Sequence, residues 1–176
     1  MIKTIVVPTD GSNHAMKAVA LAADIASKYR ARIVLLHVLM RDATPTSVKL
    51  IAKGMGLPSK TRKELDRLEA IPIESAAFAG AYTPIAIPVP DSILSEVGGL
   101  IVEKARRVVA AKRVKKVTTK LISGNAADAI IAAAKKEKAD MIIMGSRGFS
   151  DIKGLLLGSV SHKVSHLAHC TCVTVK

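Results

Sequence analysis

Three glycines near the C-terminus have the spacing of a phosphate-binding loop. They are Gly145, Gly148 and Gly158, within a segment, MGSRGFSDIKGLLLGSVS, that follows an apolar run and precedes a helical pattern. Glycine lets a ligand approach the main chain closely. Free N–H groups at the start of the following helix, around Ser159–Ser161, would face an anion, and hydroxyls there can add donors. The segment therefore predicts a site for a phosphorylated ligand, held by main-chain amides and hydroxyls.

Two common nucleotide motifs are absent from the chain. Neither GxxxxGK[ST] nor GxGxxG occurs, so no lysine inside such a motif holds the phosphates. Arg147 and Lys153 flank the loop, and either side chain could neutralise phosphate charge. An exposed cation on a loop has no binding role about as often as it has one. Arg147 is the preferred candidate because it lies between two of the glycines.

A second polar element, PTDGS (Pro8–Ser12), ends the first apolar run of the chain. In an open α/β sheet, ligands bind outside the carboxyl ends of strands, where the winding order reverses. If the strand order is 3-2-1-4-5, the first and fourth strands flank that crevice. Asp10 would then be a lone carboxylate that accepts hydrogen bonds from a ribose or a base. Taken alone, Asp10 would be interpreted as an ordinary turn or helix-start residue.

Strands and helices alternate along most of the chain, which predicts an α/β fold with a parallel sheet. Five apolar runs predict strands, at Lys3–Pro8, Arg32–Leu39, Lys116–Ile122, Asp140–Met144 and Thr171–Val175. Apolar residues at helical spacing predict helices over Asn13–Tyr29, Ser92–Lys112, the segment that follows Asn125, and Ser159–Ala168. Ser12 or Asn13 can cap the first helix, and Asn125 the third.

Residues 41–91 interrupt this alternation and predict an insertion within a single domain that spans residues 1–176. The first half is basic and partly helical, notably Ser59–Ala70, and the second half, from residue 71, has four prolines and one charge. The prolines argue against a helix that spans a membrane. Residues 71–90 are interpreted either as a lid or protein-binding arm, or as a flap packed on its own domain.

Composition narrows the possible partners. Lys and Arg outnumber Asp and Glu by 27 to 14, for a net charge of +13, which attracts polyanions or simply keeps the surface solvated. Aromatic residues are only 2% of the chain, so no stacking platform for single-stranded nucleic acid exists. The basic run 104–116 has helical spacing and favours a solvated helix face over nucleic-acid binding.

The remaining reactive side chains favour neither a metal centre nor a catalyst. His166, His169, Cys170 and Cys172 lie close in sequence, but their spacing fits no standard zinc pattern. His37, inside the second strand, is interpreted as a satisfied core histidine. The two cysteines are too far apart along a strand for a usual disulfide, and the N-terminus does not resemble a signal peptide. These features predict a reducing, cytoplasmic environment.

With the motif G-x2-G-x9-G-[ST], PTDGS at the first strand and IVLLHV at the second, the chain resembles the universal stress protein family from end to end, apart from 41–91. The resemblance implies a Rossmann-like, five-stranded parallel sheet of order 3-2-1-4-5 with helices on both faces. It also implies a homodimer through the last strand, 171–175, and binding of ATP or AMP, with Mg²⁺ or Mn²⁺ carried by the phosphates. The implied site residues are Pro8, Thr9, Asp10, Val38, Met144, Gly145, Arg147, Gly148, Gly158, Ser159, Val160 and Ser161.

Two departures from the family bear on the phosphates. Gly154 stands where members often have a basic residue, and Asp151 places a negative charge inside the loop. The prediction is a regulatory, stress-response protein that binds an adenine nucleotide with slow or no hydrolysis. Two alternatives are an ATP hydrolase or adenylyl-transfer enzyme that uses Asp10 and Mg²⁺, and a basic nucleic-acid-binding protein.

Overall fold

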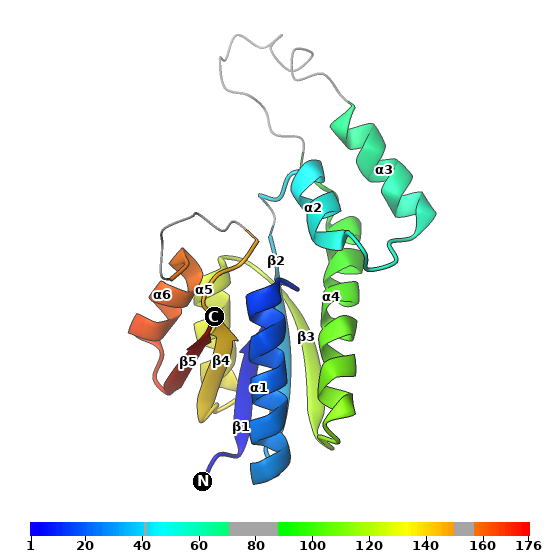
Figure 1. Cartoon of the computed structure of the whole chain (residues 1–176). Coiled ribbons are helices and arrows are strands. Elements are labelled where there is room, and N and C mark those ends of the chain that lie inside the picture. Colours follow the sequence, from blue (N-terminus) through cyan, green and yellow to red (C-terminus); the bar gives the residue numbers. More distant parts are fainter. Residues whose placement is uncertain (41, 71–87, 150–156) are drawn as a thin grey trace.

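The computed structural model describes residues 1–40, 42–70, 88–149 and 157–176, which contain a five-stranded parallel sheet. The strands lie in the order β3-β2-β1-β4-β5 (Figure 1). They are β1 (Thr4–Pro8), β2 (Arg32–Leu39), β3 (Val117–Ser123), β4 (Met141–Gly145) and β5 (Thr171–Val175). The predicted fold class and strand order are confirmed, and every strand boundary lies within one residue of its prediction.

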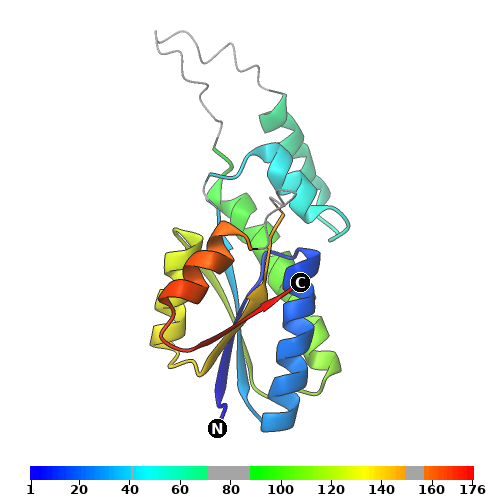
Figure 2. The same cartoon turned by 60° about the vertical axis from the view of Figure 1, so that its left-hand side comes forward.

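Helices cover both faces of the sheet. On one face lie α1 (Asn13–Tyr29) and α4 (Asp91–Ala111), and on the other α5 (Ala126–Lys136) and α6 (Ser159–Leu167) (Figure 2). The alternation of side chains along β1 divides the core, since Ile5 and Val7 pack under α1 and α4 while Val6 packs under α5. All three side chains are fully buried, as expected for the central strand of a sheet covered on both faces.

Two further helices, α2 (Pro45–Ala52) and α3 (Ser59–Glu69), lie beyond the carboxyl ends of the strands, next to the first half of α4 (Figure 1). We call them the helical segment. Their apolar side chains form a separate cluster with α4 that includes Val48, Leu65 and Ile101. The sequence predicted α3 but gave no bounds for α2. Residues 71–87, most of the expected partner-binding arm, lie outside the described residues, and an insertion at 41–91 stays a prediction.

Three helices, α1, α5 and α6, begin at the carboxyl edge of the sheet, and they differ in what accepts hydrogen bonds from their first main-chain N–H groups. The Ser12 hydroxyl caps α1 by accepting from the Ala15 N–H, and the Asn125 side chain caps α5, both as predicted. The start of α6 is different, because its N-cap is Gly158, which has no side chain to accept a hydrogen bond. Within the described residues no side chain caps α6, so its first amides can donate to another acceptor.

Candidate functional site

Three segments that are distant in sequence meet where the winding order of the sheet reverses. β1 pairs with β2 on one side and with β4 on the other, so the chain leaves the carboxyl ends of β1 and β4 in opposite directions. The residues after β1, the loop after β4 and the first turn of α6 surround this point. A main-chain hydrogen bond and a hydroxyl join the second and third of these segments, as described next.

Ser146, the first residue after β4, connects four elements. Its N–H donates to the Val175 carbonyl at 2.7 Å, and its own carbonyl accepts from the Gly158 N–H at 2.8 Å and from the Ser161 hydroxyl at 2.7 Å. Its hydroxyl lies 3.0 Å from Nδ1 of His14, in the first turn of α1. Ser146 is fully buried, so these bonds fix the loop to β5, α6 and α1 at once.

Sequence reasoning missed both Ser146 and His14. The available signal was the place of Ser146 inside the glycine motif, where a buried polar residue needs several partners. The Ser161 hydroxyl, expected to donate to a ligand, instead supports the loop in this structure. The main-chain N–H groups at the start of α6 remain as donors for an anion.

Two glycines of the motif are required by close approaches within the protein. A Cβ at Gly145 would lie 2.7 Å from the Ala15 nitrogen, because the end of β4 packs directly against the main chain of α1. A Cβ at Gly148 would lie 2.5 Å from Oδ2 of Asp10. A larger residue at Gly145 would push β4 and α1 apart, whereas one at Gly148 would displace the Asp10 carboxylate.

The residues after β1 form a tight turn that holds Asp10 in place. Its Oδ1 accepts from the Ser12 N–H at 2.9 Å, and the Thr9 hydroxyl oxygen accepts from the Gly11 N–H at 3.2 Å. The Thr9 carbonyl lies 2.9 Å from Nδ1 of His37, on β2. Burial lowers the pKa of His37, so the ring is neutral and Nδ1 donates its proton to this carbonyl. The prediction that His37 is a satisfied core histidine is confirmed.

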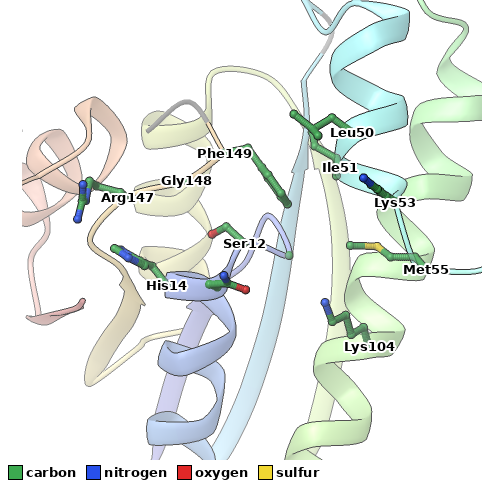
Figure 3. A pocket seen from close by; sticks show the side chains of 12 residues that line it. Ser12, His14, Leu50, Ile51, Lys53, Met55, Lys104, Arg147, Gly148 and Phe149 are labelled. Atoms are coloured by element: carbon green, nitrogen blue, oxygen red, sulfur yellow. The ribbon is translucent and has the colours of Figure 1, made fainter. Parts of the chain in front are cut away.

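A cleft of ≈ 360 Å³ opens beside this turn (Figure 3). One side, the loop wall, consists of Arg147–Phe149, and the opposite side, the helical wall, is Leu50–Met55 of α2 and its following turn. The turn that leads into α1 and the start of that helix, Gly11–His14, complete the lining together with Lys104 of α4. The volume falls within the range of small-molecule sites.

The predicted site residues divide into three groups by position. Arg147 and Gly148 line the cleft, although the Arg147 side chain extends away from it in Figure 3. The exposed residues at the start of α6 are Ser159 and Val160, with Gly158 half-buried. Ser161, in the same turn of α6, is buried. At or just beyond the strand ends, the buried residues are Pro8, Thr9, Val38 and Met144, and the half-buried ones are Asp10 and Gly145. Asp151, Lys153 and Gly154 lie outside the described residues.

Three further features concern the cysteines, possible metal ligands and membrane-spanning helices. Cys170 and Cys172 are free thiols in this structure. Within those residues, no group of three or more His, Cys, Asp and Glu side chains is arranged to hold a metal ion. None of the helices in the same part of the chain combines the length and apolar character needed to cross a bilayer.

A five-stranded, doubly wound sheet with a glycine loop at its reversal point defines an α/β protein of the Rossmann-like class. The sequence model of the universal stress protein family matches residues 1–176, so the chain belongs to that family. One relative, Universal stress protein YxiE of Bacillus subtilis, is 34% identical over 142 residues, which cover 77% of this chain and 94% of YxiE.

Solved structures with the same fold include two nucleotide complexes. A universal stress protein in complex with cAMP aligns with 99% of this chain and 96% of its own, at a TM-score of 0.58 and 21% identity. The universal stress protein of Archaeoglobus fulgidus in complex with dAMP aligns with 100% of this chain and 98% of its own, with TM-score 0.58 and 16% identity. At these identities the likeness establishes the fold.

Proposed function

We propose that this protein binds an adenine nucleotide, ATP or AMP, at the carboxyl edge of the sheet between β1 and β4. The observation that carries the proposal is the convergence of the glycine loop, the uncapped start of α6 and Asp10 at the reversal point. Main-chain amides at a helix start bind phosphate, and a carboxylate beside them can accept from ribose hydroxyls or the adenine amino group. The cAMP and dAMP complexes of related proteins support the choice of adenine.

The proposed role is regulatory, in a stress response, with slow or no hydrolysis. Asp10 is already engaged in the turn, since Oδ1 accepts from Ser12 and Oδ2 lies against Gly148. A carboxylate held in the turn and directed at ribose or adenine is poorly placed to activate a water molecule at the phosphates. A divalent cation, Mg²⁺ or Mn²⁺, would be carried by the phosphates. ATP turnover with and without Mg²⁺ tests this part, and turnover that disappears in Asp10→Ala with binding retained would favour an enzyme.

Calorimetry with AMP, ATP and adenosine tests the site itself. We expect Ser159→Glu to weaken binding of AMP and ATP by about tenfold or more, because a carboxylate at the start of α6 repels phosphate while it suits the helix dipole. Binding of adenosine should change little. Ser165→Glu, exposed on the same helix, is the control. Failure of the wild-type protein to take up either nucleotide at about 1 mM would contradict the proposal.

The proposal includes a homodimer in the cytoplasm. β5 pairs with β4 along one edge and lies at the end of the sheet, so its other edge can accept a strand from a second copy. Light scattering on the purified protein would give the subunit number. A monomer at micromolar concentration would contradict this assembly without affecting nucleotide binding.

A further inference from the structure

The cleft between the loop wall and the helical wall carries positive charge. Lys53, in the turn after α2, and Lys104, on α4, both line it, and no Asp or Glu does so among the described residues. The first turn of α1 adds the positive end of a 17-residue helix dipole. The lining therefore attracts anions, and its two lysines come from elements outside the glycine motif.

Neither lysine has an acidic partner within the part of the chain that the structure describes. Other lysines do form ion pairs there, which are Lys49 with Asp66 and Glu69, Lys112 with Asp24, Lys120 with Glu137, and Lys163 with Asp128. Lys53 and Lys104 make no ion pair or hydrogen bond within the described residues. Two ammonium groups that share one concave site without neutralisation are arranged for a ligand with more than one negative charge.

The two side chains approach the cleft from the same side. In Figure 3, Lys53 and Lys104 extend toward the interior of the cleft, facing Ser12 and the ring of Phe149. Gly148 belongs both to this lining and to the glycine motif, so the cleft begins where the motif ends. A chain of phosphates that starts at the glycine loop can therefore continue toward the lysines.

We propose that Lys53 and Lys104 bind the terminal phosphates of an adenosine di- or triphosphate, so that affinity increases with the number of phosphates. The inference rests on the proposed function and specifies its ligand. In this arrangement the glycine motif and Asp10 would hold the nucleoside and its first phosphate, and the two lysines would distinguish ATP from AMP. The helical segment, which supplies Lys53, thereby becomes part of the nucleotide site.

Calorimetry with AMP, ADP, ATP and inorganic tripolyphosphate tests the assignment. In the double variant Lys53→Gln/Lys104→Gln, affinity for ATP should fall by about tenfold or more, whereas affinity for AMP should change by less than about threefold. Affinity for ADP should fall by an intermediate factor. Tripolyphosphate, which has no adenosine, should bind the wild-type protein and lose affinity in the variant. The loss should be larger at low salt, because added ions screen the two charges.

The control is Lys28→Gln/Lys115→Gln, which removes two exposed lysines at the opposite end of the sheet. It matches the change in net charge and should leave the ratio of ATP to AMP affinity unchanged. An unchanged ratio in Lys53→Gln/Lys104→Gln would overturn the inference, while AMP binding would keep the proposed function. Tripolyphosphate binding without nucleotide binding would retain the basic site and reject the proposed function. Binding of none of the four would overturn both.

Discussion

The two walls of the cleft are attached to the sheet by different interactions. The loop wall depends on hydrogen bonds, since the buried Ser146 joins it to β5, α6 and α1. The helical wall depends on apolar packing, with Val48 and Leu65 buried against Ile93 and Ile101 of α4. The ion pair of Lys49 with Asp66 lies at the exposed surface, where such pairs contribute little, and one part-buried hydrogen bond, from the Thr61 hydroxyl to Glu96 of α4, adds to the packing.

This difference predicts how each wall responds to substitution. A hydrogen-bonded loop in tight contact with its neighbours tolerates no added atoms, and loss of one bond has a modest cost when another remains. A packed helix pair loses stability in proportion to the volume removed from its interior. Four substitutions separate these behaviours, in order of decreasing effect.

Leu65→Ala should have the largest effect. Leu65 is fully buried at the centre of the α2–α3–α4 cluster, so its truncation leaves a cavity. We expect the free energy of opening of residues 45–69, measured by amide hydrogen exchange, to fall by about 2–5 kcal/mol. Leu50→Ala, on the same segment but 59% exposed, should change it little. A loss below about 1 kcal/mol in Leu65→Ala would show that packing does not hold this wall.

Gly145→Ala should act on the loop wall by overcrowding. The added Cβ would meet the Ala15 nitrogen at 2.7 Å and the His14 carbonyl carbon at 2.8 Å, and both are main-chain atoms that move only with α1. Urea unfolding should show a loss of about 1–3 kcal/mol.

Gly99→Ala is the matched control for this substitution. A Cβ at this helical position would meet nothing within 4 Å, so the change should stabilise α4 by about 0.5–1 kcal/mol. Equal stability of the two variants would contradict the close approach of β4 and α1.

Ser161→Ala should have a smaller effect. It removes the 2.7 Å hydrogen bond to the Ser146 carbonyl, but that carbonyl keeps the Gly158 N–H at 2.8 Å. We expect a loss of about 0.5–1.5 kcal/mol in urea unfolding, because the buried acceptor is not left unpaired. Ser165→Ala, exposed on the same helix, should be neutral. An effect as large as that of Gly145→Ala would mean that the hydroxyl alone holds the loop.

The same contrast explains which features the sequence could predict. The strands and the glycine loop follow from local patterns, because apolar runs and glycine spacing are visible in consecutive residues. The order of the sheet was predicted only through the family resemblance. Ser146 was missed because its partners, Val175 and His14, are distant in sequence. The cleft was missed because Lys53 and Lys104 come to line the same site only through the packing of α2 on α4. Side-chain packing between distant helices has no local signature.

The last test concerns pH and the turn that carries Asp10. Burial lowers the pKa of His37 below its ordinary value of 6.5, so the unfolded chain takes up a proton more readily than the folded one. This contribution to stability is therefore present above the unfolded pKa and is lost as pH falls toward the folded pKa. Urea unfolding at about pH 7.5 and about pH 6 should show a loss that is smaller in His37→Gln, whereas His162→Gln, exposed on α6, should behave as wild type. The change should be the smallest of the four, because a single proton is involved and pH 6 lies only just below the ordinary value. If His37→Gln keeps the full pH dependence, His37 is not the group whose protonation lowers stability, and another titratable group must be responsible.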